Sequence, residues 1–186
     1  MANKVLFGFS DLYVGTYSVD TSGSVTLGTP YHQAGAVGFS PEPNGSKEDF
    51  YADNIAYFTD YGDGSREGDL EVAMFDDTFK TMFLGYVSAS GGGLAEVKNP
   101  TKPKVYMMFE IQGDDKARRV IMYNGSFGQI TRNMQTMEGT KTPQTETLPV
   151  SFVGDNKTGI VMVTYKSGDA GYASLFTSPP VPTITT

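Results

Sequence analysis

The sequence predicts a mainly β domain, a β-sandwich or partial barrel with one flanking α-helix. Three observations support this fold class. The 186-residue chain contains 22 glycines and 12% aromatic residues, and turn signals recur about every ten residues, a spacing typical of many short strands. Residues 69–74 alternate between apolar and acidic side chains, as a half-buried strand does. Only residues 76–85 combine helical spacing of apolar residues with end signals.

In the first part of the chain we expect strands at residues 4–9, 12–19 and 25–27, with Ser10 and Asp11 separating the first two. Residues 36–42 and 46–53 flank Pro43-Asn44-Gly45. Asn-Gly between two extended runs is a strong hairpin signal, because both residues tolerate positive φ. The sequence therefore predicts a hairpin about Asn44 and Gly45. Residues 60–68, rich in Gly and Asp, predict a long exposed loop.

The strand predicted at residues 69–74 has two chemically different faces. Leu70, Val72 and Met74 share one face, and Asp69 and Glu71 the other, since successive side chains of a strand point to opposite sides. Such a strand has one face in a core and one in water.

The helix predicted at residues 76–85 has clear ends. Asp76 can accept a hydrogen bond as N-cap, and Gly85 stands where a helix terminates. Phe79, Met82 and Phe83 follow at i, i+3 and i+4, a single apolar stripe that would pack on a sheet. We expect plain core packing there and no cofactor.

In the second part of the chain we expect a hairpin of residues 105–112 and 118–124 about Gly113-Asp114-Asp115, then strands at 127–132, 145–153 and 160–165, with a loop at 135–143. Pro149 has no N–H, so its end of the strand should lie at an edge or bulge. Residues 167–186 contain Ser178-Pro179-Pro180-Val181-Pro182, which predicts an irregular arm. The expected organisation is a β domain at 1–166 and a Pro-rich arm at 167–186.

Composition narrows the function classes. Hydrophobic residues make up 39% of the chain and charged residues 19%, as in folded domains. No apolar run approaches the roughly 20 residues of a membrane-spanning helix, and the first residues do not resemble a secretory signal. We therefore expect no membrane contact and folding in a cytoplasm. The chain has no cysteine, which excludes disulfides and thiolate sites.

The net charge of the chain argues against tight binding to nucleic acid. The chain carries −7 at pH 7, whereas tight binding to phosphates needs clustered Lys and Arg. The only basic cluster, Lys116 with Arg118 and Arg119, is expected to be a solvated hairpin face or a salt-bridge partner between subunits.

No pattern indicates catalysis or a metal. His32, the only histidine, falls in an expected loop. The pairs Asp76-Asp77 and Asp114-Asp115 suit a helix cap and a turn. Residues 60–69 lack the spacing of a calcium loop, and Gly91–Gly93 fits no phosphate-binding motif. We expect a protein that is not an enzyme, with no catalytic residue, no metal site and no cofactor.

Several segments, in order along the chain, resemble the phi13-type major tail protein family of long-tailed phages (siphoviruses). They are Lys4-Val-Leu-Phe-Gly-Phe-Ser-Asp-Leu-Tyr-Val14, Gly35-Ala-Val-Gly-Phe-Ser-Pro-Glu-Pro-Asn-Gly45, Phe50-Tyr-Ala-Asp-Asn-Ile-Ala-Tyr57, Gly68-Asp-Leu-Glu-Val-Ala73, the helix at 76–85 and Pro143-Gln-Thr-Glu-Thr-Leu148. They are specific together rather than singly, and cover the chain to about residue 166 with plausible spacing. Residues 167–186 match no feature of the family.

The resemblance implies a tail-tube fold similar to that of type VI secretion tube proteins. Six copies would form a ring whose inner strands join into one barrel, and rings would stack into a hollow tube in the virion, assembled in the host cytoplasm. DNA would pass through the lumen without tight binding. Expected partners are identical copies, the tape measure protein, the tail terminator and distal tail proteins.

Under that resemblance we assign two sets of candidate residues. Those expected to face the lumen are acidic, since like charge repels DNA phosphates: Glu42, Glu48, Asp69, Glu71 and Glu146. Those expected between subunits or stacked rings lie in residues 54–68 and in the arm: Asn54, Tyr57, Tyr61, Asp63, Arg66, Pro179 and Pro180. Ordinary solvated β-surface is the alternative for the carboxylates.

Two other functions stay open from the sequence. One is a β-sandwich on a virion surface that binds a carbohydrate or receptor, for which Tyr51, Tyr57, Phe58 and Tyr61 could supply aromatic contacts, although the chain contains no Trp. The other is a tube subunit of a contractile or secretion-type system with the same fold.

Overall fold

The computed structural model describes residues 6–184 except 46, 53–54, 63, 114–115, 133, 135 and 137–142. The described chain is mainly β with one helix, as the sequence predicts. In chain order the elements are β1 (Leu6–Val19), β2 (Val25–Leu27), β3 (Tyr31–Gln33), β4 (Ala36–Phe39), β5 (Glu42–Pro43), β6 (Lys47–Ala52), β7 (Ile55–Tyr61), β8 (Arg66–Val72), α1 (Asp77–Leu84), β9 (Val87–Ser88), β10 (Leu94–Ala95), β11 (Lys104–Gly113), β12 (Arg118–Phe127), β13 (Thr131–Arg132), β14 (Glu146–Phe152) and β15 (Met162–Lys166).

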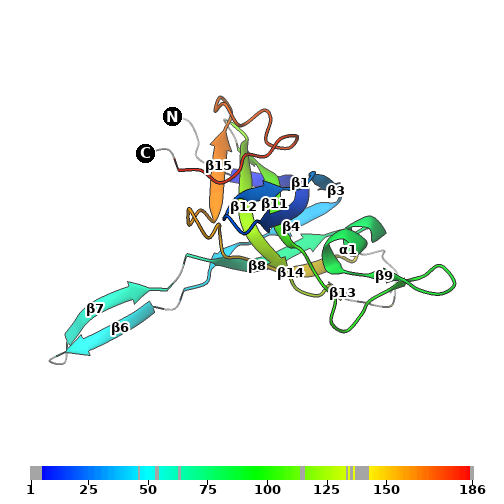
Figure 1. Ribbon diagram of the computed structural model, residues 1–186, viewed down its shortest axis with the longest axis horizontal. Coiled ribbons are helices and arrows are strands. Elements are labelled where there is room, and N and C mark those ends of the chain that lie inside the picture. Colours follow the sequence, from blue (N-terminus) through cyan, green and yellow to red (C-terminus); the bar gives the residue numbers. More distant parts are fainter. Residues whose placement is uncertain are drawn as a thin grey trace.

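Eleven strands form one antiparallel sheet (Figure 1). Its main order is β2-β1-β11-β12-β14-β8-β4, with β3 beside β1, β15 beside β12, β13 beside β14 and β5 beside β8. β6 pairs only with β7, and β9 only with β10, within the described residues. The β6–β7 hairpin projects away from the rest of the molecule in Figure 1.

β1 is one long strand where the sequence predicts two. It pairs with β11 through register shifts between Phe7 and Phe9 and between Ser10 and Tyr13. Gly8 has φ 76° and Asp11 has φ 52°, so the backbone bulges at both places and pairing resumes beyond. The predicted break at Ser10 and Asp11 is therefore a bulge and not the end of a strand.

The main core lies between the inner face of this sheet and α1. The fully buried side chains include Leu70 and Val72 of β8 and Phe79 of α1, and the Phe79 ring lies 4.8 Å from that of Phe75 and 5.8 Å from that of Phe127 between centroids. Met74 is 67% exposed, against the prediction that it shares the core face of Leu70. The reason is that β8 ends at Val72, so its alternation stops before Met74.

The helix ends where the sequence predicts. The Asp76 Oδ1 accepts a hydrogen bond from the Phe79 N–H at 2.7 Å, and Gly85 adopts the left-handed conformation at the C-cap. Phe79 and Phe83 are buried as predicted, but Met82 is 45% exposed. At about 3.6 residues per turn, residue 82 falls outside the buried arc, which extends instead to Leu84. Among the described residues, no helix is long and apolar enough to cross a membrane.

The C-terminal residues cover the other face of the sheet. Leu175 is fully buried in a second core cluster with Tyr106 and Tyr123. The Phe176 ring stacks on Tyr13 at 4.7 Å between centroids. Residues 167–177 form turns and bends rather than helix or strand, as expected from their composition. The expected arm therefore packs against the domain.

The hairpin predicted about Asn44 and Gly45 is wrong. β5 pairs with β8, and β6 pairs with β7 further along the chain. The Asn44 N–H donates to the Ser65 carbonyl oxygen at 2.9 Å, so this residue belongs to the ladder toward β8 and does not turn back. The loop predicted at 60–68 is also mostly strand, because β7 runs to Tyr61 and β8 starts at Arg66.

The predicted hairpin of the second half is confirmed as β11 and β12, and the predicted strands at 145–153 and 160–165 as β14 and β15. The strand predicted at 127–132 is reduced to β13. Pro149 lies inside β14, and its carbonyl oxygen accepts from the Gly128 N–H at 2.8 Å. The side of Pro149 that lacks an N–H therefore faces residues 128–130, which connect β12 to β13. On that side the pairing of β14 is interrupted between its ladder with β12 and its ladder with β13. The predicted loop at 135–143 lies mostly outside the described residues.

Candidate assembly surfaces

An acidic stripe follows the outer face of β8. Leu70 and Val72 point into the core, so Glu67, Asp69 and Glu71 share the opposite face. Glu42 of β5 lies directly opposite Glu67 in the ladder. Like charges opposed in this way destabilise a strand pair, so the Glu42–Glu67 pair does not stabilise the β5–β8 pairing.

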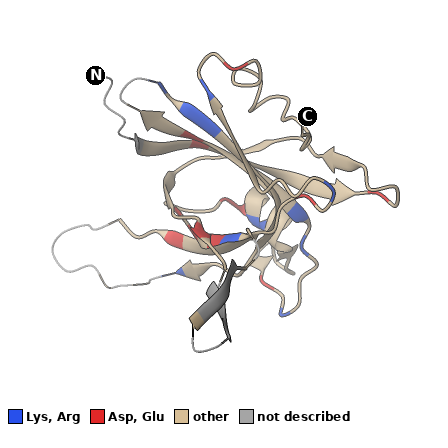
Figure 2. Cartoon of the chain, turned by 90° about the vertical axis from the view of Figure 1, so that its left-hand side faces the viewer, with Lys and Arg blue, Asp and Glu red and all other residues tan. Residues whose placement is uncertain are grey.

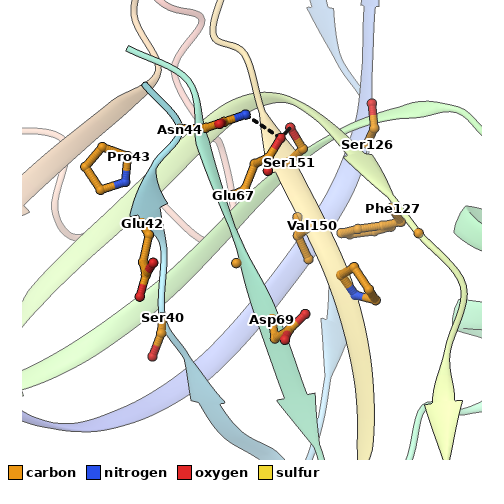
Figure 3. Close-up of a pocket in the computed structure, with 13 residues that line it drawn as sticks. Ser40, Glu42, Pro43, Asn44, Glu67, Asp69, Ser126, Phe127, Val150 and Ser151 are labelled. Atoms are coloured by element: carbon orange, nitrogen blue, oxygen red, sulfur yellow. Dashed lines mark hydrogen bonds between the residues drawn. The ribbon is translucent and has the colours of Figure 1, made fainter. Parts of the chain in front are cut away.

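A groove of ≈840 Å³ lies over this stripe (Figure 3). Glu42, Glu67 and Asp69 line it. The Glu67 Oε1 accepts from the Asn44 Nδ2 at 2.7 Å and from the Ser151 hydroxyl at 3.5 Å. The other residues that line the groove are Ser40, Pro43, Asn44, Gly68, Ser126, Phe127, Gly128, Pro149, Val150 and Ser151. None of these lining residues is Lys or Arg, so the groove wall is acidic.

Two lysines stand at the β12 margin of the groove. The Lys104 Nζ donates to the Ser126 hydroxyl at 2.6 Å. The Lys102 Nζ donates to the Gly128 carbonyl oxygen at 2.5 Å, and burial lowers the pKa of Lys102. Both ammonium groups are held by neutral oxygens of the margin, while the carboxylates occupy the other side of the groove.

Four of the predicted lumen residues can be placed, and three share the acidic stripe. Glu42, Asp69 and Glu71 lie on its strands, with Glu71 accepting a hydrogen bond from the Thr145 hydroxyl. Glu48 belongs to β6, where the structure describes the backbone only. Glu67 was missed because it fell in the predicted loop. Continuing the alternation of residues 69–74 backwards by two positions would have found it.

Glu146 does not join the stripe. It shares the inner face of β14 with the buried Leu148, two residues on. Its Oε2 accepts from the Phe75 N–H at 2.8 Å and its Oε1 pairs with the Arg132 Nε at 2.6 Å. The Lys80 Nζ lies 3.9 Å away. This carboxylate holds the entry to α1 in place, so the lumen assignment of Glu146 is wrong.

The β6–β7 hairpin carries several of the predicted contact residues. Tyr57 and Tyr61 belong to β7, in a strand rather than the predicted loop, while Asn54 and Asp63 lie outside the described residues. Ile55, next to the end of the hairpin, is 63% exposed. Figure 2 shows acidic residues, in red, gathered on neighbouring strands near the centre of the view.

The other contact candidates lie within the domain. Arg66 opens β8, and its Nη1 lies 3.5 Å from the Pro41 carbonyl oxygen. The Pro180 carbonyl oxygen accepts from the Tyr123 hydroxyl at 2.8 Å, and Pro179 is half-buried beside it. Pro180 therefore contacts its own sheet.

His32 lies in β3 and not in a loop, opposite Tyr13 of β1, with 4.8 Å between the ring centroids. Over the part of the chain that the structure describes, no three or more His, Asp or Glu side chains are grouped to hold a metal ion.

Comparisons with known proteins do not assign a family. No protein-family model matches the chain, and no curated protein matches it. The fold is similar to the anti-feeding prophage cap (AFP tube terminating cap) solved by cryo-EM, over 89% of this chain and 94% of that chain, with a TM-score of 0.49 and 8% sequence identity. A likeness at this level identifies neither family nor function, so the phi13-type resemblance stays a prediction.

Proposed function

We propose that this chain is the structural subunit of a phage tail tube, in which six copies close into a ring and rings stack into a conduit for DNA. The sequence resemblance motivates the proposal. Under this proposal the chain is not an enzyme. Its partners are identical copies along the tube, the tape measure protein inside it, and terminator and distal tail proteins at its ends.

The observation that carries the proposal is that the β6–β7 hairpin pairs with no other described strand. A two-stranded hairpin alone is at best marginally stable in water, and this one pairs with no other strand of the described chain. Its sequence includes Phe50, Tyr51, Tyr57, Phe58 and Tyr61, residues that contribute large apolar area when covered. A neighbouring copy would supply that cover in a ring or between rings.

The acidic stripe fits the same proposal. A tube through which DNA slides should repel phosphates rather than hold them. Glu42, Glu67, Asp69 and Glu71 give one face of the sheet this character, in a chain of net charge −7. We place this face toward the lumen.

Electron microscopy of the purified protein tests the proposal. Negatively stained samples over a range of concentrations should contain six-fold rings or hollow tubes, and light scattering should show mass rising with concentration. A protein that stays monomeric at every concentration would contradict the proposal. Six-fold symmetry in class averages separates the ring from other closed assemblies.

A variant without the hairpin tests the observation that carries the proposal. Replacing residues 47–61 by a short Gly-Ser linker should abolish rings and tubes, because it removes the hairpin that a neighbouring copy would contact. Circular dichroism should show that the eleven-stranded sheet is still folded. A matched variant with shortened residues 90–92, an exposed turn elsewhere, should still assemble.

A further inference from the structure

The large sheet is open between β1 and β4. β1 pairs with β11 along one side, while on its other side β3 and β2 pair only from Leu12 onward. β4 pairs with β8 and, among the described strands, with no other. β4 lies beside β1 without a ladder. Backbone groups at such an edge form a template for a strand from another chain.

A cavity of ≈650 Å³ occupies this gap. Its floor is apolar, since Phe9 and Phe39 both contact Phe109, with ring centroids 5.3 and 5.7 Å apart. Its rim carries Val37, 49% exposed, and Met162, 38% exposed. Large apolar side chains gathered at the mouth of an apolar cavity mark an interaction site.

The charged residues that line the cavity are both cationic. They are Arg66 and Arg118, and no acidic residue is among the lining side chains. Arg118 is the first residue of β12, and Arg66 is the first residue of β8. An occupant that is apolar and acidic would therefore fit both the floor and the charge of the cavity.

The β6–β7 hairpin has this character. Residues 47–61 contain five aromatic residues, one lysine and four acidic residues, and Ile55 is 63% exposed near the hairpin end. Each strand spans about 20 Å at roughly 3.3 Å per residue, long enough to cross between molecules. The hairpin projects away from its own body in Figure 1, a position from which it could reach a second copy.

We propose that the β6–β7 hairpin of one copy inserts into the cavity between β1 and β4 of a neighbouring copy, with Ile55 on the apolar floor and the acidic hairpin facing Arg66 and Arg118. This inference rests on the proposed self-assembly and names the contact that drives it. The inserted hairpin completes the sheet on the open side of β4.

Engineered cysteines test the contact directly, because the native chain has none. Ile55→Cys and Val37→Cys are made in separate chains that differ in tag length, mixed under assembly conditions and oxidised. A disulfide requires Cα atoms within about 7 Å, so a mixed dimer of intermediate size on a non-reducing gel is expected. The matched control is Val87→Cys, 48% exposed on β9, which should give far less mixed dimer with Ile55→Cys.

The cross-link distinguishes this inference from the proposed function. Rings or tubes without a cross-link between Ile55→Cys and Val37→Cys above the Val87→Cys control would overturn the hairpin contact and leave the tube proposal standing. A wild-type protein that never assembles would overturn both. A chain that carries both Ile55→Cys and Val37→Cys is also oxidised at low concentration. If its two cysteines cross-link within one chain, the hairpin folds back on its own cavity and the inference is wrong.

Charge removal gives a second readout. Arg118→Gln should raise the protein concentration needed for assembly roughly tenfold, since truncating one member of a buried charge pair is costly. Arg118→Lys keeps the positive charge and should bring that concentration part of the way back to the wild-type value. Lys157→Gln removes the same charge at an exposed site and should leave that concentration unchanged. Thermal melting of each variant at low concentration checks that the fold persists. Equal behaviour of Arg118→Gln and Lys157→Gln would contradict the inference.

Discussion

At the residue scale, α1 places two neighbouring apolar side chains in opposite environments. Phe83 is fully buried, whereas Met82 is 45% exposed. We expect Phe83→Ala to lower the free energy of unfolding by about 3–5 kcal/mol, because it removes a large buried ring and leaves a cavity. Met82→Ala is its matched control and should change stability by less than about 0.5 kcal/mol. Urea unfolding followed by circular dichroism measures both. Equal losses would mean that the helix packs on another face.

Buried tyrosines make the fold sensitive to alkaline pH. Burial raises the pKa of Tyr106 to about 12, and burial with a hydrogen bond to Glu96 raises that of Tyr86 to about 12. Burial also raises the pKa of Tyr17 and Tyr123. In the unfolded chain these phenols ionise near their ordinary value of 10.0. Stability is therefore complete below that pH and is lost as pH rises from there through the folded values.

The measurement is the urea midpoint from about pH 8 to about pH 11.5, which should fall above about pH 10. Tyr106→Phe removes one of the titrating groups and should make the fall shallower, although it also loses the hydrogen bond to the Gly28 carbonyl oxygen. A midpoint that stays flat across this range would show that these phenols ionise alike in the folded and unfolded chain.

At the element scale, Arg119 fastens the C-terminal segment to the sheet. Its guanidinium lies 4.4 Å from the ring centroids of Tyr172 and Phe176, and it pairs with Glu110 at 2.9 Å. We expect Arg119→Met to loosen residues 167–184 by local opening, so that trypsin cleaves after Lys166 several-fold faster. Mass spectrometry of the released C-terminal fragment follows the cleavage. Arg118→Met changes the neighbouring residue without these contacts, and should cleave at the wild-type rate.

An unchanged cleavage rate in Arg119→Met would show that the apolar contacts of Leu175 and Phe176 hold the segment by themselves. In that case Leu175→Ser, which places a hydroxyl in the second core cluster, becomes the variant that frees it.

The elements that sequence reasoning predicted are those with local determinants. α1 is fixed by Asp76, Gly85 and a stripe of phenylalanines within ten residues, and β11 and β12 by a close turn. The first hairpin failed because a local Asn-Gly signal competed with pairing to β8, which is distant in sequence. The same limit applies to the site. Asp69 and Glu71 are found from alternation, and the same alternation puts Glu146 on the face of Leu148, whereas its ion pair with Arg132 and its contact with Lys80 of α1 join residues that no local pattern brings together.

At the scale of the whole molecule, the sheet is covered unevenly. α1 covers the inner face, and the C-terminal segment covers the outer face of β11 and β12. No described strand pairs with the β6–β7 hairpin or closes the gap between β1 and β4, and the acidic stripe lines a groove. The first two are complementary in charge and apolar character, and the third is repulsive to DNA. The proposed tube would need this division between surfaces that bind a neighbouring copy and a surface that repels DNA.

The last prediction concerns that repulsive surface. Asp69→Lys replaces a central carboxylate of the stripe by an ammonium group, and each ring of the proposed tube would repeat the change six times around the lumen. We expect assembled Asp69→Lys tubes to retain DNA at low salt and to release it as salt rises, because phosphate contacts are screened and exchanged for counterions. Wild-type tubes should retain little DNA at either salt concentration.

The control is the double variant Asn156→Lys/Ala170→Lys, which adds the same net charge at exposed residues away from the stripe. Filter binding of labelled DNA to sedimented tubes compares the three, and equal retention by the two variants would show that total charge, not the position of the stripe, governs contact with DNA.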